Sequence, residues 1–367
     1  MIDGALTLLT PGPAGTSERV RNALLRGDLC HREPEFADLL ERIRVALPRC
    51  LNLGGTHETV LVTGSGTAAM EMALIGSVRR GRSALVVNNG VYGERLAKIA
   101  GVHGITCHEV RSEWTRPVDP AAVRAALAEH DDIDAVACVH HETTTGLINP
   151  IEEIGAATAS AGEALFVVDA ISGTGIEEPD LARVPADVIC GTANKGLHGV
   201  PGVSFVLLGD RAVERVAEVP SRSLYLDAAP HLASQRRGEV AFTPAVQACY
   251  ALDAAIAEYE EAGGFAARTR LYRERAALVR DQFDRLGLPI LVAEPFRSSS
   301  VTMLRLPGGV SYRALHDELK TRGYVVYAGQ GHLSGEYFRI CTMGEIPRRR
   351  LKELERSLAD AIAAVTR

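Results

Sequence analysis

A glycine-rich loop is the first place where this chain could do chemistry. Residues 64–69 read Gly-Ser-Gly-Thr-Ala-Ala, directly after a run of β-branched residues and before a helical pattern. Small residues let a backbone approach a ligand closely, and the free N–H groups at the start of a helix attract an anion. We therefore predict that Ser65, Gly66 and Thr67 bind a phosphate group, with the two hydroxyls adding hydrogen bonds.

Two reactive side chains follow later strand-like runs. Asp169 ends the run Phe-Val-Val-Asp at 166–169, and Lys195 comes just after Cys-Gly-Thr at 190–192. Ligands of open parallel sheets bind outside the carboxyl ends of the strands, so both side chains are expected beside the phosphate loop. A lysine that can form an imine, an acid that can pair with a pyridine nitrogen and a phosphate loop are together what pyridoxal phosphate requires.

The same loop also supports a rival interpretation. Residues 64–69 satisfy the dinucleotide fingerprint G-x-G-x-x-G/A. That fingerprint needs an acidic residue at the end of the next strand to hold a ribose hydroxyl. The corresponding residues, 86–90, read Val-Val-Asn-Asn-Gly and offer no carboxylate. A nicotinamide-dependent oxidoreductase is thus disfavoured, but it stays open as a distant alternative.

The elements that must position these residues alternate along residues 55–210. Runs of apolar residues typical of buried strands alternate with helical patterns, which predicts an α/β fold: a mostly parallel central sheet with helices on both faces. The expected strands are 59–63, 83–88, 105–110, 135–140, 164–169, 188–191 and 204–208, and the expected helices are 67–80, 92–101, 120–129 and 151–161.

The pattern changes after residue 243. Helices are expected at 244–261, 265–286, 312–322 and from 347 to the end, and strands at 290–293, 300–304 and 325–328. This mixture predicts a smaller C-terminal α+β domain. We expect an N-terminal arm (1–18), a large domain (19–245), connecting helices (246–285) and the small domain (286–367).

Composition excludes several classes of protein. The 367 residues carry 46 acidic and 40 basic side chains, a formal charge of −6, so no excess positive field favours nucleic acid. No apolar run approaches the ~20 residues of a membrane span, and we see no secretion signal.

Seven scattered cysteines without a C-x-x-C pair fit free thiols in the cytoplasm. His140 and His141 are neighbours on an expected strand and should point to opposite faces, so no metal site is predicted.

Taken together, the motifs resemble the class V aminotransferases of fold type I, and within them the 2-aminoethylphosphonate:pyruvate transaminases. The matching segments are 8–13 (Leu-Leu-Thr-Pro-Gly-Pro), 64–67, 89–93 (Asn-Gly-Val-Tyr-Gly), 141–146 (His-Glu-Thr-Thr-Thr-Gly), 168–172 (Val-Asp-Ala-Ile-Ser), 193–195 (Ala-Asn-Lys), 199–202 and 338–340 (Phe-Arg-Ile). The resemblance implies a ping-pong reaction that converts 2-aminoethylphosphonate to phosphonoacetaldehyde and pyruvate to L-alanine.

The resemblance also implies roles for particular residues. Lys195 would be the Schiff-base lysine and Asp169 the partner of the pyridine nitrogen. Tyr92 would stack on one face of the cofactor ring, with Ile171 against the other, and Thr144 would lie near the ring hydroxyl. A plain core position stays open for Tyr92.

Three more residues complete this expected site. Thr192 would join residues 65–67 in binding the phosphate. Thr243 would reach the same phosphate from the neighbouring subunit of a homodimer, although it could equally cap the helix that begins near Pro244. Arg339 would clamp the acidic group of the substrate, or else serve as a structural ion-pair partner.

Two segments depart from the family pattern: Cys-His-Arg-Glu-Pro at 30–34 and Gly-Gln-Gly-His at 329–332. Both should lie near the substrate entrance, so the amino donor stays open. The alternatives are a transaminase of alanine:glyoxylate or serine:pyruvate type, or one acting on another small acidic amine. A non-catalytic cofactor-binding regulator is disfavoured because the chain lacks a basic or helix-turn-helix appendage.

Overall fold

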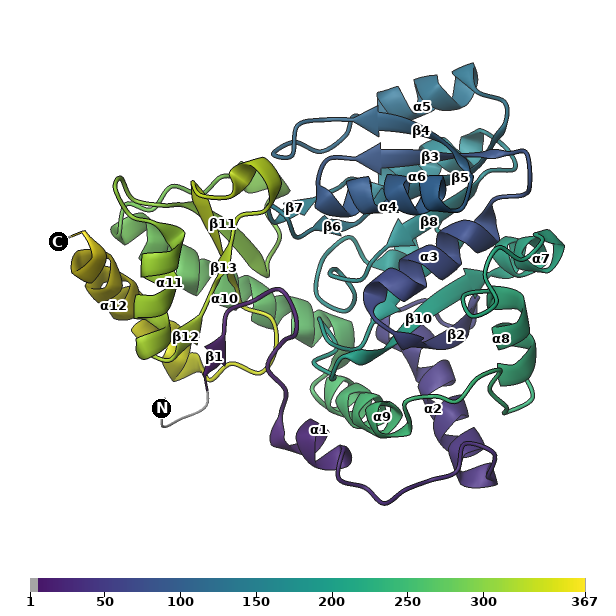
Figure 1. Ribbon diagram of the computed structural model, residues 1–367, viewed down its shortest axis with the longest axis horizontal. Coiled ribbons are helices and arrows are strands. Elements are labelled where there is room, and N and C mark those ends of the chain that lie inside the picture. The colour runs from purple at the N-terminus through teal and green to yellow at the C-terminus, as the bar shows by residue number, and fades with distance from the viewer. Residues whose placement is uncertain (1–5, 367) are drawn as a thin grey trace.

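A seven-stranded sheet forms the centre of the larger part of the molecule (Figure 1). The computed structural model describes residues 6–366. The strand order is β2 (His57–Gly64), β10 (Gly202–Gly209), β9 (Val188–Thr192), β8 (Leu165–Asp169), β5 (Ile133–Val139), β3 (Ser83–Asn88) and β4 (Thr106–Arg111). Only β10 runs antiparallel to its neighbours; the others share one direction. The predicted mostly parallel sheet is confirmed.

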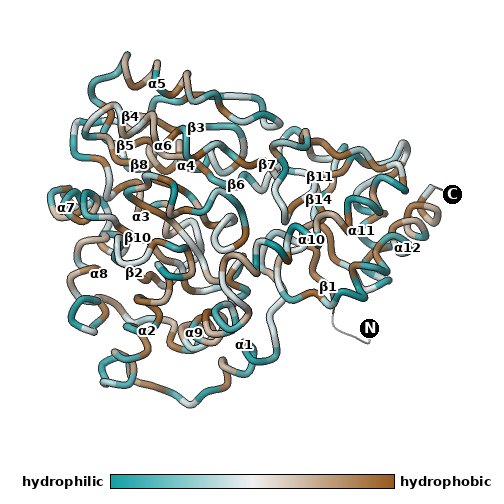
Figure 2. Tube along the Cα trace, turned by 180° about the vertical axis from the view of Figure 1, so that it is seen from behind, coloured by the Kyte–Doolittle hydropathy of each residue, from teal (hydrophilic) through white to brown (hydrophobic). Residues whose placement is uncertain are grey.

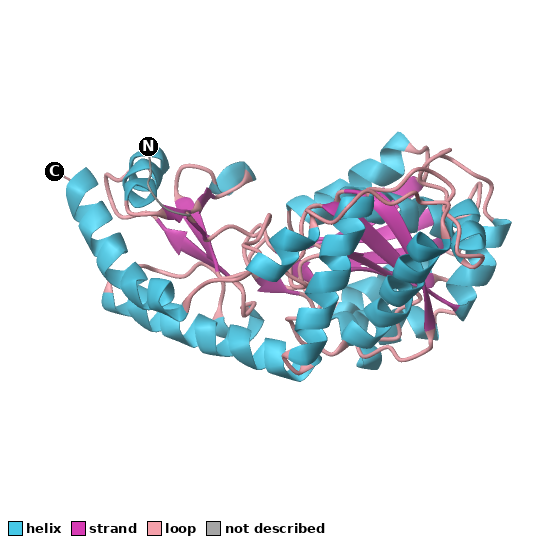
Figure 3. Ribbon diagram, turned by 90° about the horizontal axis from the view of Figure 1, so that it is seen from below, coloured by secondary structure: helices cyan, strands magenta, loops and turns pink. Residues whose placement is uncertain are grey.

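Helices cover both faces of this sheet (Figure 3). One face packs against α3 (Gly66–Ser77), α4 (Val91–Val102), α7 (Asp210–Glu218) and α8 (Ala228–Gln235). The other packs against α2 (Pro34–Cys50), α5 (Pro120–Glu129), α6 (Ile151–Ser160) and α9 (Val246–Glu261). Alternate strand residues point to opposite faces: Leu85 and Val87 enter one core, while Ala84 and Val86 enter the other. Figure 2 shows the resulting concentration of apolar residues along the strands.

A second core forms around a smaller antiparallel sheet. Its strand order is β11 (Val301–Arg305), β14 (Tyr337–Cys341) and β13 (Tyr327–Ala328). The helices α10 (Gly264–Arg285), α11 (Tyr312–Thr321) and α12 (Arg348–Val365) bury their apolar residues against it. In α12 the buried residues are Leu351, Leu354, Leu358 and Ala361, the three-or-four-residue spacing of one helix face.

The N-terminal arm runs from the small sheet to the large one. Strand β1 (Thr7–Leu8) pairs in parallel with β12 (Tyr324–Val325), and α1 (Glu18–Ala23) then contacts α9. The division at residues 18, 245 and 285 stays a prediction: of the expected connecting helices, α9 packs into the core of the large sheet and α10 into that of the small sheet. Residues 1–5 and 367 of the outer segments lie outside the described residues. Within 6–366, no helix is both long and apolar enough for a membrane span.

One expected strand is wrong. Residues 290–293 form only an isolated bridge between Ile290 and Leu304, followed by a 3₁₀ helix at Glu294–Phe296. Pro289 and Pro295 lie on either side of the segment, and proline cannot donate to a strand ladder. The expected strand 325–328 is in fact two short strands with different partners, because β12 pairs with β1 and β13 with β14.

A buried carboxylate ties together the amino edge of the central sheet. Asp134 of β5 is 1% exposed, and its oxygens accept hydrogen bonds from Arg79 Nε (2.9 Å) and Nη2 (2.8 Å) and from Arg82 Nε (3.0 Å). Arg215 of α7 lies 3.4 Å away. Burial alone would raise the pKa of Asp134, but these arginines outweigh it and lower the pKa to about 2.

Replacing Asp134 with alanine should therefore lower the free energy of unfolding by about 3–5 kcal/mol, because Arg215 would be left buried without its counter-charge. Urea denaturation at pH 7 measures this. The control is Asp253→Ala, which removes a single 3.4 Å contact to the exposed Arg42 and should cost less than about 1 kcal/mol. Equal losses in the two variants would contradict the assignment.

Candidate active site

The carboxyl ends of β8 and β9 bring the two reactive side chains to one edge of the sheet. Asp169 is the last residue of β8 and lies in register with Cys190 of β9 and Val139 of β5. Lys195 follows β9 by three residues and is 9% exposed. The charge of Lys195 is close enough to lower the pKa of Asp169. The structure thus places both residues where the sequence predicted them.

The N-terminal arm covers Lys195. A Cβ atom on Gly12 would lie 2.9 Å from Lys195 Cε and 3.2 Å from Nζ, and Gly12 has a φ of +131°. Position 12 therefore requires glycine both for its backbone conformation and for the close approach of the lysine. Sequence analysis quoted Gly12 within a motif but gave it no role. Gly12 and Lys195 are far apart in the sequence, so no local sequence pattern could have predicted their contact.

Asp169 is buried without a full set of partners. Its Oδ1 accepts a hydrogen bond from Ile171 N at 3.0 Å. Burial raises the pKa of Asp169 to about 6, and the Ile171 N–H, Lys195 and Arg95 only partly oppose this rise. A cationic group bound against the carboxylate would favour its ionised form.

The predicted phosphate loop lies against this pair. Ser65 is the N-cap of α3 and its side chain makes no capping bond, so the first N–H groups of the helix stay free for an anion. A Cβ on Gly66 would lie 2.9 Å from Ile171 Cδ1, which shows how closely the loop packs on the turn after Asp169. Thr67 Oγ1 accepts a hydrogen bond from Arg95 Nη1 at 3.1 Å.

Thr192 joins the loop through a hydroxyl chain. Its Oγ1 lies 2.9 Å from Asn194 Oδ1 and 3.0 Å from the hydroxyl of Ser204 on β10. The Ser204 hydroxyl is also 3.1 Å from the carbonyl oxygen of Gly64. Because β10 pairs with both β2 and β9, it brings the ends of these two strands side by side. Thr192 is therefore next to the loop, as predicted.

Glu142 organises the opposite wall and was missed as a site residue. Its carboxylate accepts hydrogen bonds from Tyr92 N (3.2 Å) and Gly93 N (3.4 Å), two free donors at the start of α4, and from the Thr144 hydroxyl. A Cβ on Gly90 would lie 2.3 Å from Glu142 Cδ. Burial raises the pKa of Glu142 to about 7 despite these donors. Glu142 thus fixes both Tyr92 and Thr144.

Arg95 is the second residue that sequence reasoning missed. Its guanidinium lies 4.7 Å from the centroid of the Tyr92 ring and donates to Thr67. Tyr92 is half-buried and packs against one of the two cores of the sheet, so the alternative of a core position stays open. Arg95 follows Tyr92 by three residues, one helical turn, and this spacing on a helix that enters the site could have revealed it.

Arg339 lies on the other side of the site, on β14. It is buried, and its guanidinium donates to three neutral oxygens: Ala328 O (3.1 Å), Thr143 O (3.0 Å) and Gln330 Oε1 (3.1 Å). None of these is a carboxylate, and within residues 6–366 Arg339 forms no ion pair, so the structure does not support the interpretation of Arg339 as an ion-pair partner. A buried cation held only by neutral acceptors suits an anionic ligand.

The segment 330–332 connects Arg339 to the large domain. Gln330 bonds Arg339, and the His332 ring lies 4.4 Å from the ring of Trp114. Gly331 has a φ of +54°, and a Cβ there would lie 2.7 Å from Trp114 Cη2. The segment that departs from the family pattern thus touches the arginine expected to bind substrate.

Thr243 lies two residues before Ala245, whose N–H donates to Thr63 Oγ1 at 3.0 Å, next to the predicted phosphate loop. It is exposed and lines a cleft of about 840 Å³ together with residues 31–34 and 237–242. It makes no capping bond to the helix that follows, since the N-cap of α9 is Ala245. This location leaves the prediction that Thr243 serves a neighbouring subunit untested. The second divergent segment, His31-Arg32-Glu33, lines the same cleft.

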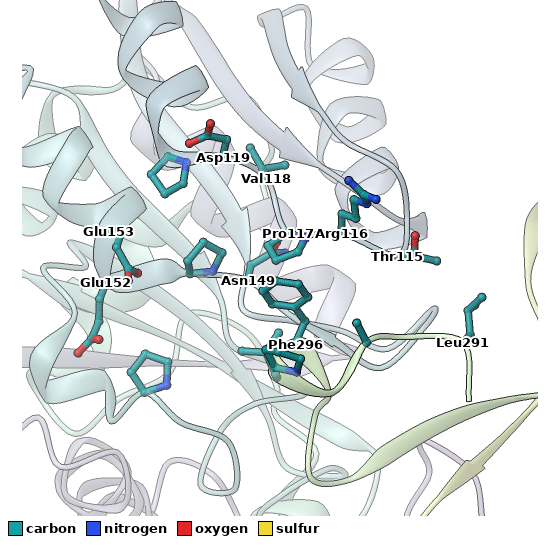
Figure 4. A pocket seen from close by; sticks show the side chains of 16 residues that line it. Thr115, Arg116, Pro117, Val118, Asp119, Asn149, Glu152, Glu153, Leu291 and Phe296 are labelled. Carbon is teal, nitrogen blue, oxygen red and sulfur yellow. The ribbon is translucent and has the colours of Figure 1, made fainter. Parts of the chain in front are cut away.

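A further cleft of about 820 Å³ lies away from the predicted residues (Figure 4). Thr115–Pro120 and Ile148–Pro150 of the large domain line one side, and Leu291 and Phe296 line the other. None of the residues predicted from the sequence contributes to it. The residues predicted from the sequence to do chemistry therefore lie outside this cleft.

The arrangement at the sheet edge defines what could bind there. The free N–H groups of α3 suit a phosphate, Asp169 suits a cationic ring nitrogen, and the buried Lys195 suits a covalent bond to a carbonyl carbon. The residues present fit a ligand that carries all three groups.

Solved structures define the class of protein to which this arrangement belongs. This chain superposes on an aspartate aminotransferase of subgroup IV from Thermus thermophilus with a TM-score of 0.89 and 28% sequence identity. The superposition covers 98% of this chain and 99% of the Thermus chain. Alanine–glyoxylate aminotransferase from Nostoc sp. gives a TM-score of 0.90 at 26% identity, over 100% and 97% of the two chains. The fold is that of the fold type I aminotransferases.

Sequence comparison then gives the family. Residues 17–341 match the family model "Aminotransferase class-V", and this chain belongs to that family. It is 36% identical over 359 residues to the 2-aminoethylphosphonate–pyruvate transaminase of Syntrophobacter fumaroxidans, covering 97% of this chain and 96% of the other. A transaminase of the same name from Burkholderia lata is 35% identical, with 98% and 95% covered.

Replacing Asp169 with asparagine should stabilise the ligand-free protein above pH 6. The folded pKa of about 6 exceeds the ordinary 3.8, so wild type loses stability as the pH rises from about 4 to 6 and stays penalised above that range. Asparagine keeps the acceptor for Ile171 N and has no charge to bury. The gain should reach up to about 3 kcal/mol at pH 8.

Thermal melts of both proteins at pH 4.5 and pH 8 measure this gain. The difference in Tm should be small at pH 4.5 and larger at pH 8. Asp317→Asn serves as the control, because that carboxylate is exposed and its pKa is lowered by His316. A constant difference between wild type and Asp169→Asn at both pH values would refute the assignment.

Proposed function

We propose that this aminotransferase uses pyridoxal 5′-phosphate to move the amino group of 2-aminoethylphosphonate to pyruvate. The observation that carries the proposal is the buried Lys195 beside the buried Asp169, with the free amino end of α3 next to both. The two 2-aminoethylphosphonate–pyruvate transaminases reported above support the choice of substrates, since they match along almost the whole chain.

The residues of the site would hold the cofactor as follows. Lys195 would bind it covalently and Asp169 would keep its ring nitrogen protonated. Tyr92 and Ile171 would flank the ring, and Thr144, held by Glu142, would lie near the ring hydroxyl. The phosphate ligands would be Ser65, Gly66, Thr67 and Thr192. When bound, pyridoxal phosphate supplies an electron sink for the electron pair left on the substrate carbon.

Lys195 would also carry the proton. Lys195 is 9% exposed and packs against Gly12, so its Nζ would take the proton from the substrate carbon in a site that is largely closed to water. Asp169 has to stay ionised during this step. Burial raises its pKa to about 6 in the ligand-free chain, and a cation bound against it would favour the ionised form at lower pH.

Arg339 would bind the acidic group of each substrate in turn. In a ping-pong reaction one site accepts first the phosphonate of the amino donor and then the carboxylate of pyruvate. The guanidinium is already held by three neutral acceptors, so it need not leave another anion to bind either group. Gln330 and the contact of His332 with Trp114 would set the shape of that subsite.

A homodimer completes this proposal. Thr243 is exposed and lines a cleft that does not include Lys195, and from there it could reach the phosphate site of a second subunit. All seven cysteines are free thiols, which supports a reducing compartment such as the cytoplasm. The second candidate function is an alanine:glyoxylate type transaminase, favoured by the full-length match to the Nostoc structure.

A coupled alanine-forming assay tests the substrate assignment. Purified protein supplied with pyridoxal phosphate should be yellow and should form L-alanine faster from 2-aminoethylphosphonate and pyruvate than from taurine, serine or β-alanine. Lys195→Ala should lose both the absorbance and the turnover, because Lys195 is the one buried lysine within residues 6–366. Lys98→Ala changes an exposed lysine of α4 and should behave as wild type.

Two outcomes of this assay would redirect the proposal. Faster turnover with alanine and glyoxylate than with the phosphonate would move the assignment to the second candidate. A colourless wild-type protein, or a Lys195→Ala variant with unchanged absorbance, would remove the cofactor assignment itself.

Arg339→Lys should raise KM for both 2-aminoethylphosphonate and pyruvate by roughly 10- to 100-fold. Lysine keeps the charge but loses the planar fork that bonds two oxygens at once. The absorbance of the bound cofactor should be unchanged. Arg313→Lys, at an exposed position of α11, is the control. A loss confined to one of the two substrates would contradict a shared anion site.

A further inference from the structure

A cluster of metal-ligating side chains lies at the amino edge of the central sheet, away from the active site. His108 is on the edge strand β4, His130 is the C-cap of α5, and Asp132 immediately precedes β5. The carbonyl oxygen of Asp132 accepts a hydrogen bond from Ser83 N at 2.9 Å, at the start of β3. This contact holds the turn between α5 and β5 against the sheet, so three separate elements meet at one place.

The ligand atoms of the cluster are close enough to share an ion. One nitrogen of each histidine and one carboxylate oxygen all lie within 4.8 Å of one another. The two imidazole rings are stacked, with centroids 3.7 Å apart and planes inclined by 17°. His108 Nε2 lies 3.6 Å from Asp132 Oδ1, too far for a hydrogen bond.

An unsatisfied polar atom points to a missing partner. His108 Nε2 is buried and has no hydrogen-bond partner among residues 6–366, although it faces a carboxylate. Buried polar atoms of folded proteins are nearly always paired, so an unpaired ring nitrogen needs an explanation. A cation between the nitrogen and the carboxylate would satisfy both groups at once.

The charge around the cluster favours a cation. The carboxylate two positions along the chain, Asp134, is neutralised by Arg79, Arg82 and Arg215. Asp132, by contrast, has only His108 as an ion-pair partner in the described part of the chain. The carboxylate of Asp132 therefore forms no ion pair with an arginine or lysine within residues 6–366.

We propose that His108, His130 and Asp132 bind one divalent transition-metal ion, with Zn²⁺ as the best match. Two imidazole nitrogens and one carboxylate oxygen are typical zinc ligands, whereas Mg²⁺ and Ca²⁺ prefer oxygen alone. Water would fill the remaining position. Zinc–nitrogen bonds are about 2.0–2.1 Å long, so the two rings have to tilt apart until both lone pairs meet at the ion.

The surroundings allow this movement. The side chains of His108 and Asp132 are 24% and 38% exposed, so an ion can enter from solvent and the rings can rotate. The bound ion would join the edge strand β4 to the turn that precedes β5. Because the active site lies at the opposite edge of the sheet, the expected effect is on stability rather than on the reaction. This inference does not rest on the proposed function.

Sequence analysis predicted no metal site because it considered only the adjacent pair His140 and His141. In the structure those two rings face different partners, the carbonyl oxygens of Glu178 (3.1 Å) and Ser172 (3.4 Å). His108 and His130 are separated by a complete helix, and no short spacing motif marks them as a pair.

Zinc titration of the full-length protein tests the proposal. After treatment with EDTA, wild type should bind one equivalent of Zn²⁺ by calorimetry, and its Tm should rise by about 2 °C or more in excess Zn²⁺ but not in Mg²⁺. Co²⁺ should give a visible absorption band from a site of low coordination number. His130→Asn and Asp132→Asn should each lose that equivalent and the rise in Tm.

Two control variants separate this site from other zinc ligands. His103→Asn removes a histidine that pairs with one carboxylate, Glu71 at 2.6 Å, but has no second imidazole, and it should keep the bound equivalent. Cys30→Ser removes the exposed thiol and should also keep it. Asp132 is partly exposed, so Asp132→Asn should fold normally, and circular dichroism without metal checks this.

Each other result overturns the proposal. If wild type binds no Zn²⁺, the cluster is only a stacked histidine pair. If the equivalent persists in both His130→Asn and Asp132→Asn, or disappears in Cys30→Ser, the ion is bound elsewhere.

Discussion

The burial of Asp169 and Lys195 at the carboxyl edge of the central sheet is the constraint on which the rest of the structure depends. This position is unfavourable for the charged form of Asp169: its carboxylate accepts one main-chain hydrogen bond, and burial raises its pKa to about 6. The packing of the surrounding strands and helices offsets the free-energy cost of burying this carboxylate. The parallel strands β5, β8 and β9 fix the position of the pair, and the two apolar cores on either face of the sheet hold those strands.

Buried carboxylates at the two edges of the same sheet have pKa values shifted in opposite directions. At the amino edge Asp134 is surrounded by arginines and its pKa falls to about 2. At the carboxyl edge Asp169 and Glu142 have too few charged partners, and their pKa values rise to about 6 and 7. The first edge is a structural anchor. The second is electrostatically incomplete until a ligand with a cationic ring and an anionic group occupies it.

Much of the fold follows from the sequence because apolar strands and helical patterns alternate regularly up to residue 210. The phosphate loop, Asp169 and Lys195 could be placed from local patterns alone, since each lies just after a recognisable strand. Glu142, Arg95 and Gly12 could not, because their roles come from contacts across the fold: Glu142 caps a helix that begins at Val91, and Gly12 packs on Lys195. The missing strand at 290–293 shows the reverse case, where two prolines override β-propensity.

The pairing of β1 with β12 affects when the site can form during synthesis. Thr7 and Leu8 are made more than three hundred residues before their partners, Tyr324 and Val325. The large sheet can assemble while later residues are still being translated, whereas β1 has no strand to pair with until β12 has been made. The cover that Gly12 forms over Lys195 is thus among the last contacts made, and a nascent chain holds an open, incompletely enclosed lysine until its C-terminal sheet has folded.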